Sequence, residues 1–203
     1  MNPASLKLLP LLLIVMLASC AHMRPEKPLL SADEHIRLAS IYESRGETEL
    51  ALRHLRDAVR VNGKNPEAHF AMGNFFLRSK DYVEAERAYQ LAIELGPEEG
   101  RFYNNLGWLY MEEGRTGEAE AAVESALEKD PEKSFIYLDT LGVIQTRAGN
   151  YAEAERNLKK AEAITPAGGN EGLAEIYSHL ADLYEKTGET NKAEEIREKI
   201  KGL

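Results

Sequence analysis

The chain has 203 residues, of which 43% are hydrophobic and 29% are charged, and its formal net charge at pH 7 is −9. This length fits one domain or one short repeat array. Because the charge is acidic and no segment gathers Lys and Arg on one face, the composition argues against a nucleic-acid binder and against a helix lying on an anionic membrane surface.

The first segment, residues 1–19, differs in kind from the rest of the chain. Lys7 is the only charged side chain before Arg24, and the run from Leu8 to Leu17 is almost entirely apolar. This run of about ten residues is too short to span the hydrocarbon core of a membrane, which takes about twenty. A short apolar run between a positive residue and small residues is typical of a signal peptide.

The segment ends at Cys20 in the run Leu-Ala-Ser-Cys, which resembles the lipobox of bacterial lipoproteins. That resemblance implies that Cys20 is acylated and becomes the first residue of the mature protein. Cys20 is also the only cysteine, so an internal disulfide is impossible. The alternatives are a plain secreted protein with an incidental cysteine, or a short uncleaved anchor. Ala21, in place of an aspartate, resembles the outer-membrane sorting signal of Gram-negative lipoproteins.

Residues 20–31 follow as a tether that contains Pro25 and Pro28. An extended, proline-containing segment rises about 3.1 Å per residue, so the tether reaches roughly 30 Å. We expect it to hold the folded part of the chain away from the bilayer.

The remainder, residues 32–203, repeats with a period close to that of helix-turn-helix arrays. Ala39, Gly73 and Gly107 are each 34 residues apart. The most regular unit carries the recurring residues Tyr103, Leu106, Gly107, Tyr110, Gly114, Ala119, Val123, Ala126 and Pro131. This pattern resembles the tetratricopeptide repeat (TPR), which implies an all-α, right-handed α-α superhelix of about five repeats. We place the units at residues 32–65, 66–99, 100–133, 135–168 and 174–203.

Small residues at fixed positions define the turns and the closest contacts of each unit. Glycines predict left-handed turns between the two helices, and the second unit has Lys80 there, where we expect strain. Close approach of the paired helices is predicted at Ala39, Gly73, Gly107, Gly142, Ala181, Ala51, Ala85, Ala119, Ala154 and Ala193. Residues 167–172 are an insertion that we expect to form a longer loop. Arg197, in place of a core residue, is typical of the polar end of a solenoid.

No pattern in the sequence predicts catalysis, a cofactor or a metal site. None of the five histidines has a partner at the spacing of helical metal ligands, although His35 and His69 share a repeat position and could be stacked neighbours. The simpler interpretation is that these two replace the aromatic residue usual there. A phosphate-binding glycine loop and a Ser-His-Asp order are also missing, so we predict that the chain is not an enzyme.

The first helices of a TPR array line its concave side, where partners bind. By repeat register, the predicted partner-binding groove consists of Phe70, Asn74, Leu77, Asn104, Asn105, Trp108, Met111, Ile136 and Val143. Its apolar centre includes the only tryptophan, a common binding hot spot. Asn74 and Asn105 could hydrogen-bond an extended peptide. Phe70, Ile136 and Thr140 replace the basic clamp of chaperone-binding TPRs, which argues against a chaperone-tail receptor. Alternatively, Trp108 only fills the superhelix, or the convex second helices make the contact.

The lipobox, short tether and repeats together resemble pilus-biogenesis TPR lipoproteins. In that family the protein helps a secretin ring reach the outer membrane and multimerise. The resemblance implies a non-enzymatic scaffold of the bacterial envelope, with a protein or peptide partner, membrane contact through the lipid on Cys20, and no nucleic acid. Alternative interpretations are an adaptor for peptidoglycan enzymes or a protease, and a subunit of an exopolysaccharide synthesis or export system.

Overall fold

The computed structural model describes residues 30–203. Residues 1–29, with the predicted signal peptide, Cys20 and most of the tether, lie outside the described residues. The described part is helical and contains no strand. Its helices are α2 (Ala32–Ser44), α3 (Thr48–Val61), α4 (Pro66–Arg78), α5 (Tyr82–Leu95), α6 (Gly100–Glu112), α7 (Thr116–Lys129), the 3-10 turn η1 (Pro131–Lys133), α8 (Ser134–Ala148), α9 (Tyr151–Ile164), α10 (Asn170–Lys186) and α11 (Thr190–Lys201). Not one of these helices combines the length and the apolar character needed to cross a membrane.

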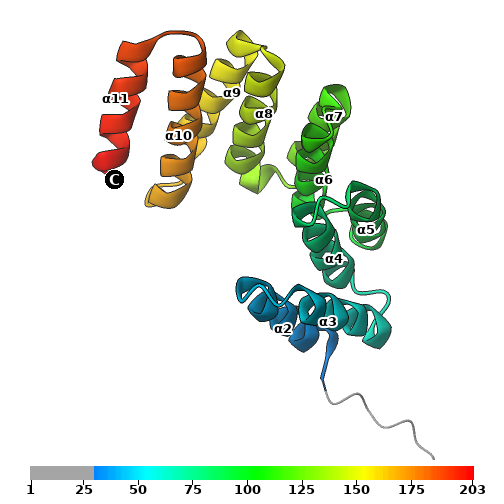
Figure 1. Ribbon diagram of the computed structural model, residues 1–203. Coiled ribbons are helices and arrows are strands. Elements are labelled where there is room, and N and C mark those ends of the chain that lie inside the picture. The colour runs from blue at the N-terminus through cyan, green and yellow to red at the C-terminus, as the bar shows by residue number, and fades with distance from the viewer. Residues whose placement is uncertain (1–29) are drawn as a thin grey trace, which may run out of the picture. The chain divides into compact units, whose positions relative to one another are not determined.

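The helices of the compact unit Ala32–Leu203 form five successive pairs, from α2–α3 to α10–α11 (Figure 1). Each second helix also packs against the first helix of the next pair, and each first helix contacts the next first helix. Within the described residues, the second helices approach one another less closely and meet through long side chains, as where Lys199 of α11 donates to Glu162 of α9 at 3.3 Å. The first helices therefore form one continuous layer, and the predicted all-α solenoid of helix pairs is confirmed.

The same hydrogen-bonded turn joins the two helices of every pair. In the first pair the backbone N–H of Glu47 donates to the Tyr42 carbonyl at 2.9 Å, and in the second the N–H of Asp81 donates to the Phe76 carbonyl at 2.9 Å. This turn needs one residue with positive φ, which is normally a glycine. Lys80 takes that place with φ 59°, so the second unit forms the expected turn with a non-glycine residue in the left-handed region, where strain is expected.

Small residues let the paired helices pack closely, as the sequence predicts. An added Cβ at Gly107 would lie 2.5 Å from Cγ2 of Val123, and one at Gly142 would lie 2.4 Å from Cγ of Leu158. Both partner side chains are fully buried. Side chains larger than hydrogen at these two glycines would therefore force the helices apart.

Helix α8 begins at Ser134, within one residue of the expected start of the fourth unit. The connection between the fourth and fifth units differs from the sequence prediction. The expected loop over residues 167–172 is shorter, because α10 already begins at Asn170 and is 17 residues long. Leu173 and Ile176 extend the apolar face of α10 over the neighbouring core. Burial of these side chains outweighs the cost of about 1 kcal/mol for placing Gly172 in a helix.

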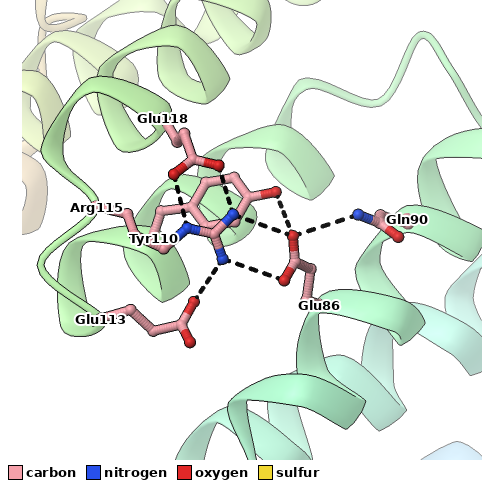
Figure 2. A network of polar contacts seen from close by, with 6 residues as sticks. All are labelled: Glu86, Gln90, Tyr110, Glu113, Arg115 and Glu118. Atoms are coloured by element: carbon pink, nitrogen blue, oxygen red, sulfur yellow. Dashed lines mark hydrogen bonds and ion pairs between the residues drawn. The ribbon is translucent and has the colours of Figure 1, made fainter.

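A polar network joins the second repeat to the third (Figure 2). Arg115 lies 4.1 Å from the ring centroid of Tyr110 and donates hydrogen bonds to Glu86 at 3.2 Å and Glu113 at 2.8 Å, and it also pairs with Glu118. The Tyr110 hydroxyl donates to Glu86 at 2.7 Å. Burial and the adjacent Glu86 carboxylate raise the pKa of Tyr110 to about 12, so the hydroxyl remains a donor at neutral pH. An arginine sandwiched between an aromatic ring and glutamates thus stabilises this repeat junction.

Candidate functional site

The layer of first helices contains a cavity of about 450 Å³ between α6, α8 and α10. We call it the Trp108 pocket; it is lined by Asn104, Trp108, Phe135, Ile136, Asp139, Thr140, Glu171, Gly172, Glu175 and Ile176. A second cavity of about 360 Å³ lies beside it and shares Trp108 as a wall. Trp108 therefore borders open space on two sides instead of being sealed in the core.

The apolar wall of the Trp108 pocket combines anchored and exposed side chains. Trp108 is half-buried and packs against the central core cluster. Ile136, by contrast, is 40% exposed. Side chains held in place by the core while one face remains open are typical of binding hot spots. The pocket thus presents a fixed apolar surface from α6 and α8.

An ion pair between His179 and Asp139 joins α10 to α8 beside the Trp108 pocket. Nδ1 of His179 lies 2.8 Å from Oδ1 of Asp139, whose side chain is buried. Burial of His179 disfavours its charged form, but the hydrogen bond and charge of Asp139 outweigh this effect and raise the pKa of His179. The pair links the fourth and fifth repeats and separates the two cavities that share Trp108.

The N-terminal part of the first-helix layer has a smaller cavity, of about 300 Å³, between α2, α4 and α6. Its charged groups are already paired. Arg78 donates to Glu43 at 2.6 Å, and Arg101 bonds to Glu67 and Glu99. The Arg101 guanidinium also lies 5.0 Å from the ring centroid of Phe70. This cavity therefore offers a ligand fewer unpaired charged and polar groups than the Trp108 pocket does.

Phe70 is one of several predicted groove residues that the fold uses for packing. Its ring lies 4.8 Å from that of Phe102 and 5.9 Å from that of Tyr89. Met111 is 7% exposed, and the half-buried Leu77 and Val143 pack against the same core cluster. These apolar groups therefore contribute to packing between repeats as well as to the surface of the first-helix layer. A side chain on the layer of first helices also meets the neighbouring first helix, and repeat register alone does not reveal this contact.

The asparagine pair predicted to hold a peptide backbone is engaged within the fold. Oδ1 of Asn74 accepts hydrogen bonds from Nδ2 of Asn105 at 2.8 Å and from the Tyr89 hydroxyl at 2.7 Å. Both lone pairs of that oxygen are therefore occupied. Asn104, the neighbour of Asn105, is 7% exposed and belongs to the Trp108 pocket.

The sequence did not identify Phe135, Gly172, Ile176 or the two glutamates Glu171 and Glu175 as residues of the pocket. Both glutamates lie on the first turns of α10, over residues that were expected to belong to a loop or to begin the last unit. Leu173 and Ile176, three residues apart, were the available signal that the helix starts early.

The histidines are arranged differently from the sequence expectation. His35 faces His54, with 2.9 Å between their Nδ1 atoms, and the Nε2–H of His69 donates to the Gly63 carbonyl at 3.0 Å. The alternative in which His35 and His69 stack on each other is not seen, because each ring makes one of these contacts instead. Asp57 lies within metal-ligand reach of His35 and His54, but its carboxylate already accepts hydrogen bonds from Arg60. The short contact between the two imidazoles is accounted for by one tautomeric hydrogen bond.

Comparisons with known proteins agree on one family, the tetratricopeptide repeat proteins. Tetratricopeptide repeat family profiles match residues 36–100, 76–138 and 134–200, and together they cover almost all of the helical unit. The type IV pilus assembly protein PilF of Pseudomonas aeruginosa is 26% identical over 187 residues, which is 88% of this chain and 72% of that protein.

Solved structures are similar as well. The Pseudomonas aeruginosa PilF structure matches with a TM-score of 0.70 and 25% identity, over 84% of this chain and 75% of that chain. PilW, described as a widely conserved type IV pilus biogenesis factor, matches with a TM-score of 0.73 and 22% identity, over 84% and 76% of the two chains. The TPR protein TTC0263 of Thermus thermophilus matches with a TM-score of 0.71 and 22% identity, over 83% and 89%. The chain therefore belongs to the tetratricopeptide repeat family and resembles the TPR proteins of pilus biogenesis.

Proposed function

We propose that this chain is a non-enzymatic scaffold of the bacterial envelope that binds a segment of a protein partner along its first helices. The observation that carries the proposal is the Trp108 pocket, which is formed by three successive first helices. Its volume is in the range of ligand cavities, and Trp108 and Ile136 offer it apolar contact area. TPR proteins bind protein partners, which supports the same conclusion.

The partner that we propose belongs to an outer-membrane assembly such as a type IV pilus secretin. The support is the similarity to PilF over 88% of this chain and the fold shared with PilW. We further propose that acylated Cys20 anchors the protein to the membrane, most simply to the periplasmic face of the outer membrane. The sequence around Cys20 carries this part of the proposal.

Site-specific crosslinking tests the binding surface. A photoreactive amino acid replaces Ile136, which is 40% exposed in the Trp108 pocket, in the full chain expressed in its host. The matched control replaces Val83, which is 69% exposed on the second helix α5. We expect Ile136, and not Val83, to crosslink to a secretin subunit, identified by mass spectrometry. Equal crosslinking from both positions would contradict binding along the first helices.

A deletion strain tests the assembly role. If the chain assists secretin assembly, its deletion should reduce heat-stable secretin multimers, and expression of the intact chain should restore them. Normal multimers in the deletion strain would contradict the secretin assignment. Altered cell-wall turnover in that strain would then favour the adaptor for peptidoglycan enzymes, and loss of surface polysaccharide would favour the export subunit.

A further inference from the structure

The Trp108 pocket carries more acidic groups than the neighbouring cations of residues 30–203 neutralise. Glu171 and Glu175 are exposed, lie one helical turn apart on α10 and line the cavity, and neither forms an ion pair within the described part of the chain. Asp139 is paired with His179, whose charge also attracts the nearby Glu175. No Lys or Arg of the described residues lines this pocket. Its electrostatic potential is therefore negative, and a cationic group would complement it.

The pocket also contains a buried amide oxygen without a hydrogen-bond partner. Asn104 is 7% exposed, and its buried Oδ1 has no partner among residues 30–203. Buried polar side chains almost always have a hydrogen-bond partner, so such an atom requires an explanation. Because the oxygen and nitrogen of an amide exchange places by rotation about one bond, Asn104 can offer a ligand an acceptor or a donor without breaking an existing bond.

Two other repeat junctions of the same chain show what completes such an arrangement. Arg101 lies over Phe70 and Phe102 and pairs with Glu67 and Glu99. Arg115 lies over the Tyr110 ring and pairs with three glutamates. In both places the guanidinium stacks on an aromatic ring while its N–H groups bond carboxylates. The Trp108 pocket has the aromatic rings and the glutamates, but no arginine from the described part of the chain lines it.

We propose that the Trp108 pocket binds an arginine side chain of the partner segment, with an adjacent aliphatic side chain of that segment on Ile136. The guanidinium stacks on the aromatic wall and pairs with Glu171 and Glu175, and the partner backbone or guanidinium donates to Asn104. This inference rests on the proposed function, because it names the chemistry by which the partner is recognised. An arginine is favoured over a lysine since only its planar group stacks and pairs at once.

The only tryptophan of the chain reports directly on the pocket. The full chain is titrated with an acetylated and amidated peptide that contains Leu-Arg-Leu between Gly and Ser residues, while Trp108 fluorescence is recorded. The matched peptide has citrulline, which keeps the shape of arginine and removes its charge. We expect a saturable fluorescence change with the arginine peptide and binding at least about fivefold weaker with the citrulline peptide. Equal binding of the two peptides, or no saturable change up to about 10 mM, would overturn the inference.

A pair of charge-neutral variants tests the carboxylates. Glu171→Gln with Glu175→Gln should weaken the arginine peptide at least about fivefold and reduce the salt dependence of its binding. Glu124→Gln with Glu128→Gln is the control, because these two glutamates are also exposed and one turn apart, on α7, away from the pocket. Similar losses in both double variants would refute a specific role for Glu171 and Glu175. Helical ellipticity and melting temperature are measured for all variants to check that they remain folded.

Crosslinking separates this inference from the proposed function. If the Ile136 crosslink to a secretin subunit persists in the Glu171→Gln, Glu175→Gln variant, the scaffold function stands and arginine recognition is refuted. If the arginine peptide binds with the expected charge dependence but no secretin crosslink forms, the pocket chemistry is supported and the secretin assignment fails.

Discussion

Replacement of Gly142 by alanine should destabilise the protein, although alanine is the better helix former. Gly142 lies within α8, where an added Cβ would be 2.4 Å from Cγ and 2.7 Å from Cδ2 of Leu158. Leu158 is fully buried on α9. Because Cγ is the branch point of the side chain, rotating a terminal methyl group does not relieve the contact.

Two opposing effects determine the magnitude. Overpacking a rigid core costs about 1–3 kcal/mol. The change from glycine to alanine inside a helix contributes about 1 kcal/mol in the opposite direction. We therefore expect the free energy of unfolding to fall by about 0–2 kcal/mol for Gly142→Ala, and a change of about 1 kcal/mol shifts the melting temperature of a chain of this size by about 2–4 °C.

The sign should reverse when Leu158 is removed. Leu158→Ala alone costs about 2–5 kcal/mol because it leaves a cavity. In that background the new methyl group at position 142 meets no clash, so Gly142→Ala should stabilise by about 1 kcal/mol. The two changes are then coupled by about 1–3 kcal/mol in a double-mutant cycle.

Thermal and urea unfolding followed by helical ellipticity measure all four proteins of the cycle. Gly117→Ala on α7 is the control, because an added Cβ there meets no atom within 4 Å and the substitution should not destabilise. The reasoning about close packing would be refuted if Gly142→Ala changed the melting temperature equally in the wild-type and Leu158→Ala backgrounds.

Three further predictions concern the second turn, the α8–α10 ion pair and the lipid anchor. Lys80 has φ 59°, so Lys80→Gly should raise the free energy of unfolding by about 0.5–1 kcal/mol in urea titrations, whereas a lower value would exclude strain at this turn. The pKa of His179 is raised in the folded protein, so the stabilisation by the ion pair is fully present below about pH 6.5 and is lost as the pH rises through the folded pKa. His179→Gln should accordingly cost more stability near pH 6 than near about pH 9, and an equal or larger cost at the higher pH would contradict this assignment. Cys20→Ala should release the chain from membrane fractions and abolish fatty-acid labelling; labelling that persists would show that Cys20 is not the acylated residue.

Much of the fold could be predicted because the same local structure recurs at a fixed spacing in a repeat protein. The 34-residue spacing of Ala39, Gly73 and Gly107 identified the helix pairs. The turn glycines and Lys80 marked positions where only positive φ closes the hydrogen-bonded turn. These features depend on residues within one unit, so the chain reveals them without any knowledge of how units are placed.

The candidate site was predicted less completely, since its contacts join different units. Trp108, Ile136 and Asn104 were identified by register, but register could not distinguish an open position from one covered by the next first helix, as at Phe70 and Met111. The early start of α10 also brought Glu171 and Glu175 to the pocket.

Residue order alone specifies the helix pairs, their turns and the glycines at which they touch, because these features depend on backbone geometry over short distances. Other features emerge only when the repeats are packed together: His179 pairs with Asp139, Asn74 binds Asn105, and Oδ1 of Asn104 has no partner among residues 30–203. These contacts span 31 to 40 residues where they form. They depend on the rotation and translation of one repeat against the next, and side-chain reach of a few ångströms turns a small change in that placement into a different set of partners.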